Sequence, residues 1–227
     1  MDRRNRPPAA ASTAVAIAIA VTMPPKSGID GRRLRSERTR QLIIDAYVAL
    51  VRDSGHAPTA AQVAERAGYS VRSVFERFPD LEALRLAVVD QALAEGRSDA
   101  ALQAIDQDRA TRLRIQVHSR AHNRERWLPL WQAMAKQPEL SAEMVARIEK
   151  VRELSMRRIE AVFARELSTV DDRERRNALI ALEALTEFES WERLRQMFGL
   201  SFEEGCATWV TAFDRLLPPT PPIPAVS

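Results

Sequence analysis

Glycine and cysteine are both scarce in this sequence of 227 residues, which has seven glycines and one cysteine. A single cysteine, Cys206, excludes a disulfide within the chain and fits a reducing compartment. The sequence has no glycine-rich phosphate loop, no nucleophile elbow and no HExxH pair. We therefore predict that the protein is not an enzyme and has neither a cofactor nor a metal site.

The N-terminal segment lacks an apolar run long enough to span a bilayer as a helix. Three arginines precede an Ala/Val/Ile run over residues 9–21, which superficially has the order of a secretory signal. The run is short and rich in alanine, and the rest of the chain is typical of a cytoplasmic protein. We interpret residues 1–31 as a disordered basic tail, with Met23 as an alternative translation start, and predict a cytoplasmic protein without a membrane partner.

Strand-like alternation is also absent, whereas aliphatic residues recur at helical spacing almost throughout. The predicted fold is therefore all-α. Capping residues and glycines separate the expected helices. These helices cover residues 36–53, 60–67, 71–78, 81–95, 109–126, 128–136, 141–166, 172–198 and 201–217. The proline-rich residues 218–227 are predicted to be a tail that cannot pack.

Positive charge is unevenly distributed. The whole chain has a formal net charge of +3, and residues 26–77 contain ten cations against six anions. This excess predicts a polyanionic partner near the N-terminus, although a solvated basic face explains it equally well. Elsewhere, carboxylates alternate with arginines at helical spacing, which is typical of a solvated surface.

The segment over residues 59–78, TAAQVAERAGYSVRSVFERF, predicts two short helices joined by a tight turn. Gly68 permits the left-handed backbone that such a turn needs. Val74 and Phe78 are expected to point inward, while Arg72 is presented outward from the second helix, as in a recognition helix. An ordinary helical hairpin would contain the same turn, but the basic arm that precedes the first helix favours a DNA-binding helix-turn-helix.

In this region the sequence resembles the tetracycline-repressor (TetR) family. The matching pieces are Thr59, Val63-Ala64, Ala67-Gly68-Tyr69-Ser70, Ser73-Val74-Phe75, Phe78-Pro79-Asp80 and Glu82-Ala83-Leu84, within a stretch from about Arg35 to Val89. The resemblance implies a homodimeric regulator, usually a repressor, that is released from operator DNA when a ligand binds the C-terminal domain. Two positions depart from the pattern. Phe75 replaces a tyrosine that reaches a phosphate, and Leu81 replaces a lysine that contacts the DNA backbone.

The predicted DNA contacts lie on the basic arm, at the helix caps and on the recognition helix. They are Arg32, Arg33, Arg35, Arg38, Thr59, Ser70, Val71, Arg72, Ser73, Phe75 and Arg77. Arg72 is the strongest candidate for direct readout, because an arginine can bond a guanine through two hydrogen bonds. Residues 32–80 are thus assigned to a three-helix DNA-binding domain.

Residues 81–217 are assigned to a helical domain for ligand binding and dimerisation. Apolar faces of its last two long helices predict a dimer interface or, equally, intramolecular core: Leu185, Phe188, Trp191, Leu194, Trp209 and Phe213. Aromatic and methionine side chains predict a pocket for an apolar or flat aromatic effector, with two histidines as a polar lining: His118, His122, Trp127, Trp131, Met134, Met156 and Phe163. The two histidines are four residues apart but lack a third ligand, so a metal site is not predicted.

The sequence as a whole predicts a homodimeric repressor that binds operator DNA and is released by a small apolar ligand. The alternative is an all-helical protein-interaction module, or an enzyme, with an incidental basic N-terminus. The effect of Arg72→Ala on DNA binding separates the two hypotheses.

Overall fold

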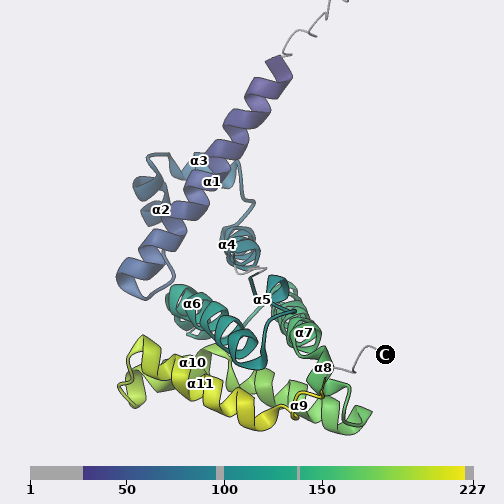
Figure 1. The fold of residues 1–227 in the computed structure, drawn as a ribbon. Coiled ribbons are helices and arrows are strands. Elements are labelled where there is room, and N and C mark those ends of the chain that lie inside the picture. The colour runs from purple at the N-terminus through teal and green to yellow at the C-terminus, as the bar shows by residue number, and fades with distance from the viewer. Residues whose placement is uncertain (1–27, 96–99, 137–138, 223–227) are drawn as a thin grey trace, which may run out of the picture.

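The structure, a computed structural model, describes residues 28–95, 100–136 and 139–222. Within these ranges it contains helices and no strand, which confirms the all-α prediction (Figure 1). The elements are α1 (Gly28–Ser54), α2 (Ala60–Ala67), α3 (Val71–Phe75), α4 (Leu81–Glu95), α5 (Ala100–Gln103), α6 (Arg109–Ala135), α7 (Ala142–Val162), α8 (Ala164–Leu167), α9 (Asp172–Leu185), α10 (Phe188–Glu192), the π-helix η1 (Arg193–Met197) and α11 (Phe202–Leu216). None of the described helices is both long and apolar enough to cross a membrane. The expectations for residues 1–27 and 223–227 lie outside the described residues.

The first helix, α1, begins at Gly28 and not at Ser36 as predicted. Residues 28–31, which were assigned to a disordered tail, are therefore helical. The reason is local, because no proline interrupts the chain from Gly28 to Ser54 and arginine and leucine favour helix. The first turns of α1 extend beyond α2 and α3 in Figure 1.

A first hydrophobic core joins the three N-terminal helices to the rest of the molecule. It includes Ile43 and Tyr47 of α1, Val74 of α3 and Leu84 of α4, all nearly inaccessible to solvent. The same core contains Trp127 and other residues from the C-terminal half of α6. The helix-turn-helix unit is thus packed directly on the C-terminal domain.

The helix α6 is continuous from Arg109 to Ala135, whereas the sequence predicted a break near residue 127. Pro129 lies inside it, and the buried side chains of Leu128 and Leu130 on either side hold the helix together through that position. Its first half, with Leu113 and Val117, belongs to a second hydrophobic core shared with α7, α9, α10 and α11. One helix therefore connects the two cores.

Two of the long helices predicted for the C-terminal half are interrupted. The first stops at Val162, because the buried Phe163 adopts a non-helical backbone between α7 and α8. The second stops at Leu185, where the hydroxyl of Thr186 donates to the carbonyl oxygens of Leu182 and Glu183. Buried side chains at both breaks override the helical periodicity of the sequence.

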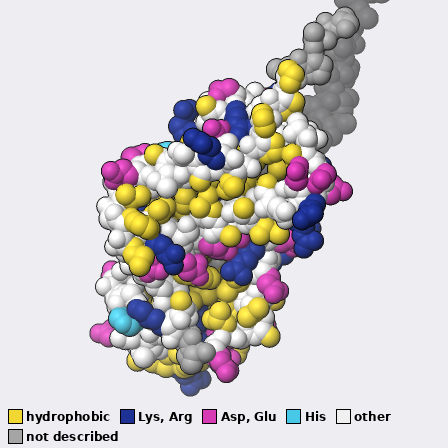
Figure 2. Space-filling model, turned by 90° about the horizontal axis from the view of Figure 1, so that it is seen from below, with side chains coloured by type: hydrophobic (Ala, Val, Ile, Leu, Met, Phe, Trp, Pro, Cys, Tyr) yellow, Lys and Arg dark blue, Asp and Glu magenta, His cyan; other side chains and the backbone are white. Residues whose placement is uncertain are grey.

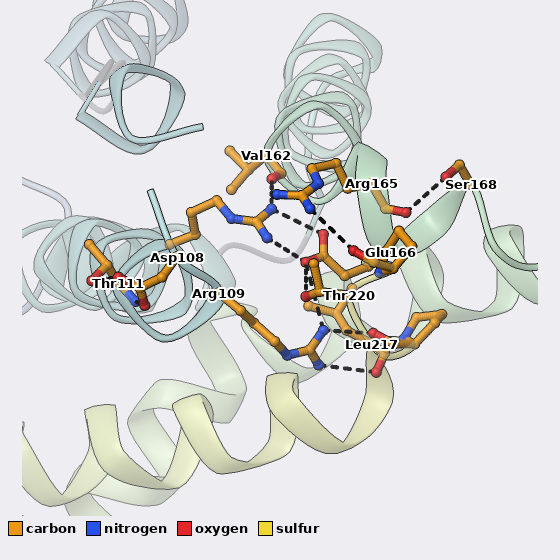
Figure 3. A network of polar contacts seen from close by, with 12 residues as sticks. Asp108, Arg109, Thr111, Val162, Arg165, Glu166, Ser168, Leu217 and Thr220 are labelled. Carbon is orange, nitrogen blue, oxygen red and sulfur yellow. Dashed lines mark hydrogen bonds and ion pairs between the residues drawn. The ribbon is translucent and has the colours of Figure 1, made fainter. Parts of the chain in front are cut away.

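The proline-rich segment after α11 packs on the domain over its described part, which corrects the prediction of a tail without contacts. The Arg109 guanidinium donates to the carbonyl oxygens of Leu217 and Pro218, at 3.2 and 2.6 Å, and Arg165 donates to Pro221 at 3.2 Å (Figure 3). Proline lacks an amide N–H but keeps its carbonyl acceptor, so an arginine can hold such a segment in place.

Candidate nucleic-acid interface

The turn between α2 and α3 has the geometry that the sequence predicted. Gly68 adopts a left-handed backbone with φ of 73° and ends α2, and the amide of Tyr69 donates to the Ala64 carbonyl at 2.9 Å. The hydroxyl of Tyr69 lies 3.4 Å from that of Thr39 in α1. Because Val63 and Ala64 are buried beneath the turn, the angle between the two short helices is fixed by packing.

The hydroxyl groups predicted to contact DNA cap the helices. Thr59 and Gln62 form a capping box at the start of α2. The Ser70 oxygen accepts from the Ser73 amide at 3.1 Å at the start of α3, and the two serine hydroxyls lie 3.0 Å apart. These side chains are exposed or half-buried beside the recognition helix, so capping orients them on its surface.

The outward face of α3 carries one almost fully exposed arginine. The Arg72 side chain is 88% exposed, and its Nε donates to a carboxylate oxygen of Glu76 at 3.1 Å. Val71 and Phe75 lie beside it with about two fifths of their surface exposed. Val74 faces the opposite way and is 1% exposed, so α3 is held by its buried side while Arg72 remains free to reach a partner.

The recognition helix is shorter than predicted and Arg77 is less available. The α-helix ends at Phe75, and the Arg77 and Phe78 amides both donate to the Val74 carbonyl in a tightened turn. Phe78 precedes Pro79, a position that disfavours continued helix. The Arg77 side chain is 28% exposed and its Nε is buried without a hydrogen-bond partner, so it does not point freely outward as expected.

The basic arm is part of α1. Arg32, Arg33, Arg35 and Arg38 are exposed on its first turns. Arg40, two residues after Arg38, places its guanidinium 4.8 Å from the centre of the buried Phe78 ring. The arm is thus helical and carries four exposed cations.

The residues predicted to line a ligand pocket do not surround one cavity. Trp127 and Met134 lie in the first core and Phe163 in the second, while Met156 is half-buried on α7. Trp131 stacks on Phe188 with ring centres 5.2 Å apart. His118 and His122 lie against Phe202 of α11, with ring centres 6.1 and 4.6 Å away. Three of the seven, Trp127, Met134 and Phe163, are therefore core residues, and the other four are half-buried or exposed.

Two hollows lie elsewhere. One of about 250 Å³ is lined by α1, α4 and α6 beside the first core, and Trp127 forms part of its wall. The other, of about 450 Å³, is an open depression along the surface of α11. In the described residues, no group of three or more histidine, cysteine or acidic side chains is placed to hold a metal ion.

Half of the residues predicted for the dimer interface are interior. Trp191, Trp209 and Phe213 have no exposed surface within the single chain, so they are core residues and cannot touch a partner. Leu185, Phe188 and Leu194 are half-buried around them. The exposed apolar side chains of this region are instead Ile180, Met197, Phe198 and Leu216. Figure 2, which views the molecule from below Figure 1, shows hydrophobic side chains gathered in a band across the surface.

Sequence reasoning missed a polar stripe inside the C-terminal domain. Arg112, Gln116, Arg120 and Arg124 follow one another at four-residue spacing on α6, and three of them are almost completely buried. The Arg112 guanidinium forms an ion pair with the fully buried Glu166 of α8 and donates to the Val162 carbonyl at 2.7 Å (Figure 3). The regular spacing was the available signal, but it was interpreted as a solvated face.

The carboxylate of Glu166 in α8, which faces the Arg112 end of this stripe, has several bonding partners. Burial acts to raise its pKa, but hydrogen bonds from Arg112 and Thr220 hold the pKa below its ordinary value. Arg109 lies 3.9 Å from the same carboxylate. Glu166 is therefore a charged group that ties α6, α8 and the C-terminal segment together.

Comparison with known proteins supports the fold. No family model and no curated protein matches the sequence. Several solved structures do match the fold, beginning with a TetR-family transcriptional regulator from Streptomyces coelicolor. It has a TM-score of 0.60 and 18% identity over 79% of this chain and 80% of that one. The chain has the TetR-family fold.

Two further solved structures with this fold belong to proteins that are described more specifically. NalD of Pseudomonas aeruginosa, the secondary repressor of the MexAB-OprM multidrug efflux pump, has a TM-score of 0.60 and 19% identity over 82% of this chain and 98% of that one. The multidrug binding protein EbrR, complexed with imidazole, has a TM-score of 0.55 and 20% identity over 90% of this chain and all of that one. At these identities the likeness establishes the TetR-family fold, and the residue-level roles rest on the geometry described above.

Proposed function

We propose that the protein is a sequence-specific DNA-binding transcriptional regulator, a homodimeric repressor that a small ligand releases from its operator. The observation that carries this proposal is the placement of Arg72. Its side chain is 88% exposed near the start of a short helix whose opposite side is anchored by the buried Val74. The similar structures include a transcriptional regulator and a repressor, which supports the same function.

The contact between Arg72 and Glu76 is weak enough to be exchanged for DNA. An exposed ion pair at i,i+4 spacing contributes only about 0.3–0.5 kcal/mol. A bidentate bond from arginine to guanine discriminates between bases by about 1–3 kcal/mol. Phosphate contacts would come from the exposed Arg32, Arg33, Arg35 and Arg38, which position the protein without reading sequence.

Phe75 and Leu81 cannot make the two contacts with the DNA backbone that a tyrosine and a lysine would make at these positions. Phe75 is 43% exposed beside Arg72 and has no hydroxyl to offer a phosphate. Leu81 is half-buried against the first core and carries no charge. Binding is therefore expected to depend more strongly on the arginines of α1, which supply the sequence-independent attraction.

Dimerisation through α9, η1 and α11 completes the proposal. Met197 and Phe198 are 75% and 66% exposed, and Ile180 and Leu216 are also exposed on the same part of the chain. Water-exposed apolar groups of this size favour burial against a second copy, and two recognition helices are needed to meet two half-sites. Sedimentation of the free protein at micromolar concentration tests this part, and a monomer would contradict it.

The contacts of α4 offer a physical route from the C-terminal domain to α1. Gln41 of α1 donates to Gln91 of α4 at 2.8 Å, and Asp90 of α4 accepts from Arg147 of α7 at 2.9 Å. Ser141 also contacts Glu82 at the start of α4. A shift of α7 would therefore move α4 and, through the contact of Gln91 with Gln41, α1 of the helix-turn-helix unit.

The test is a gel-shift titration against a duplex selected from a random-sequence library, with excess nonspecific competitor. Arg72→Ala should weaken specific binding by about 1–3 kcal/mol, roughly 5- to 150-fold, because the base contact is lost. Arg114→Ala is the matched control, since Arg114 is an exposed arginine of α6 and its removal changes the net charge equally.

Either of two results would contradict the proposal. Binding that disappears with competitor or moderate salt would mean that the arginines of α1 merely attract phosphates. Equal affinity of the Arg72→Ala and native proteins for the selected duplex would mean that α3 does not read bases. In both cases the protein-interaction module becomes the better hypothesis.

A further inference from the structure

The polar stripe on α6 is the unusual feature of the protein interior. Among the described residues, six polar or charged residues are buried, and all belong to the C-terminal domain: Arg112, Gln116, Arg124, Glu166, Glu183 and Thr186. Arg120 lies between Gln116 and Arg124 on the same face of α6, since residues four apart on a helix are neighbours. Buried polar groups are stable only when they are bonded, so each requires a partner.

Both ends of the stripe are bonded mainly to other groups of the protein, although the Nε of Arg112 is also buried without a partner. At one end Arg112 is paired with Glu166 and bonded to the Val162 carbonyl. At the other end, the Arg124 Nε donates to the Thr186 carbonyl at 2.8 Å, and its guanidinium lies 4.3 Å from the centre of the Phe188 ring. These ends behave as ordinary structural contacts.

The middle of the stripe is not satisfied. Gln116 is 1% exposed, and neither its Nε2 donor nor its Oε1 acceptor has a hydrogen-bond partner. Arg120 donates through Nη1 to the Ser155 hydroxyl of α7, while its Nε and Nη2 are buried without a partner. Leaving a glutamine amide and half of a guanidinium unbonded in the interior costs free energy, so something outside the chain is expected to complete them.

The free atoms of Arg120 have a specific geometry. Nε and Nη2 form one edge of the planar guanidinium, with two parallel N–H bonds at the spacing of the two oxygens of a carboxylate. Gln116 lies one helical turn away on the same face and offers one further donor and one acceptor. Three donor atoms and one acceptor without partners are therefore buried within one turn of α6, beside the Ser155 contact with α7.

The charge around Arg120 also favours an anion. The groups that face it are Glu183, Glu187, Arg124 and Arg158. Glu187 accepts a hydrogen bond from Arg152 at 2.8 Å, so its charge is balanced elsewhere. Burial and the neighbouring Glu187 raise the pKa of Glu183 to about 6, so Glu183 is still largely ionised at neutral pH, but it faces Arg124 as well as Arg120. Burial lowers the pKa of Arg120 to about 9, so at neutral pH the guanidinium still carries its positive charge.

We propose that Gln116 and Arg120 form a buried subsite for the carboxylate group of a small-molecule effector, with the Arg120 Nε–Nη2 edge binding its two oxygens. This inference rests on the proposed function and changes the expected ligand from purely apolar to an apolar carboxylic acid. The neighbouring buried side chains of Val117 on α6 and Ile159 on α7 would cover its apolar part. Neither hollow described above is lined by Gln116 or Arg120, so binding requires α6 and α7 to adjust, and this adjustment would be transmitted to α4.

The test is a binding screen of the full-length protein against benzoate, indole-3-acetate, octanoate and a wider set of aromatic and aliphatic carboxylic acids, each beside its primary amide. Ligand-observed NMR identifies binders, and calorimetry measures their affinities. We expect carboxylates to bind and their amides to bind at least about tenfold more weakly, because the amide cannot accept two charge-assisted bonds from arginine.

Two variants locate the subsite. Arg120→Met keeps much of the length of the side chain but removes the fork, and it should weaken carboxylate binding by at least about tenfold. Gln116→Leu should weaken binding less. In the absence of ligand Gln116→Leu should melt at the same temperature as the native protein or higher, because it removes only unbonded polar atoms from the core. A purely structural role of Gln116 would lower that melting temperature, whereas Arg120→Met also loses the bond to Ser155 and is therefore judged by ligand affinity.

The inference is overturned if no acid binds better than its amide, or if Arg120→Met binds the acids as well as the native protein does. Its failure is separable from that of the proposed function. A protein that binds its selected DNA duplex but shows no preference for carboxylates retains the regulator function and loses only this subsite. If carboxylates bind and need Arg120 but do not change the affinity for DNA, the subsite is supported and ligand-controlled release from DNA is contradicted.

Discussion

The two hydrophobic cores of the molecule differ in the polar groups that they contain. The first core, which holds α1 to α4 and the end of α6, consists of apolar side chains and the ring of Tyr47. The second core is crossed by the α6 stripe, in which Arg112, Gln116 and Arg124 are buried. The N-terminal unit thus exposes its polar groups, whereas the C-terminal domain encloses several of its own.

This difference corresponds to the kind of partner that each region can reach. A macromolecule such as DNA contacts only what is on the surface, and Arg72 is on the surface. A small molecule can be enclosed, and Gln116 and Arg120 present unbonded atoms only to the interior. Arginine occurs in both regions, but its contribution to the free energy of unfolding depends on its surroundings. An exposed ion pair adds little to that free energy, whereas a buried charge without its partner lowers it strongly.

The largest expected effect comes from breaking one ion pair in each region. Glu166→Leu should lower the free energy of unfolding by about 3–5 kcal/mol, because Arg112 remains charged and buried without its partner. Asp53→Ala, which breaks the exposed pair with Arg66 at 3.0 Å, should cost at most about 1 kcal/mol. Urea denaturation followed by circular dichroism measures both.

A double variant provides the control. Arg112→Met combined with Glu166→Leu should recover most of the loss, because two apolar side chains replace a charged pair in a dry site. If Glu166→Leu alone costs no more than Asp53→Ala, the burial of charge does not distinguish the two regions, and the comparison fails.

A smaller effect is expected from adding one methyl group in each region. A Cβ at Gly205 of α11 would lie 2.9 Å from Cζ3 and 3.0 Å from Cη2 of the Trp191 ring, so Gly205→Ala should cost about 1–3 kcal/mol by overpacking the second core. Gly31→Ala in α1 meets no atom within 4 Å and should stabilise by up to about 1 kcal/mol through helix propensity. Thermal unfolding compares the two, and a stabilising Gly205→Ala would show that Trp191 can move freely in its site.

Much of the helix-turn-helix unit could be predicted from sequence, because its signals are local. Thr59 and Ser70 cap helices that begin one residue later, and Gly68 has the positive φ that the turn required. The outward position of Arg72 follows from the register of a helix anchored by Val74. Each of these inferences depends on residues within a few positions of one another, so tertiary packing had little opportunity to override them.

The interior of the C-terminal domain could not be predicted in the same way. Arg112 and Glu166 are 54 residues apart in sequence, and nothing local indicates that they meet. A row of arginines and a glutamine at four-residue spacing is usual for a helix facing solvent, and only tertiary packing buries it here. For the same reason, the sequence could not decide whether Trp191 and Trp209 belong to a dimer interface or to the core in which they lie, since an apolar face does not reveal what covers it.

The smallest expected effect is a dependence of stability on pH that arises in the second core. Burial, followed by the charge of Glu187, raises the pKa of Glu183 despite the opposing arginines Arg120 and Arg124. The folded protein therefore binds this proton more tightly than the unfolded chain does. The stabilisation is complete below the ordinary pKa of a glutamate and is lost as the pH rises through the raised value.

Glu183→Gln should remove that dependence. Because glutamine is neutral at every pH, the variant should match the native protein near pH 4 and exceed it at pH 8 by on the order of 1 kcal/mol, the free energy of roughly one pKa unit. Glu149→Gln on the exposed surface of α7 is the control and should change neither value. Denaturation at the two pH values measures the difference. If native and Glu183→Gln proteins lose stability in parallel as the pH rises, Glu183 is ionised in the folded protein at its ordinary pKa, and the second core tolerates that charge as readily as the surface does.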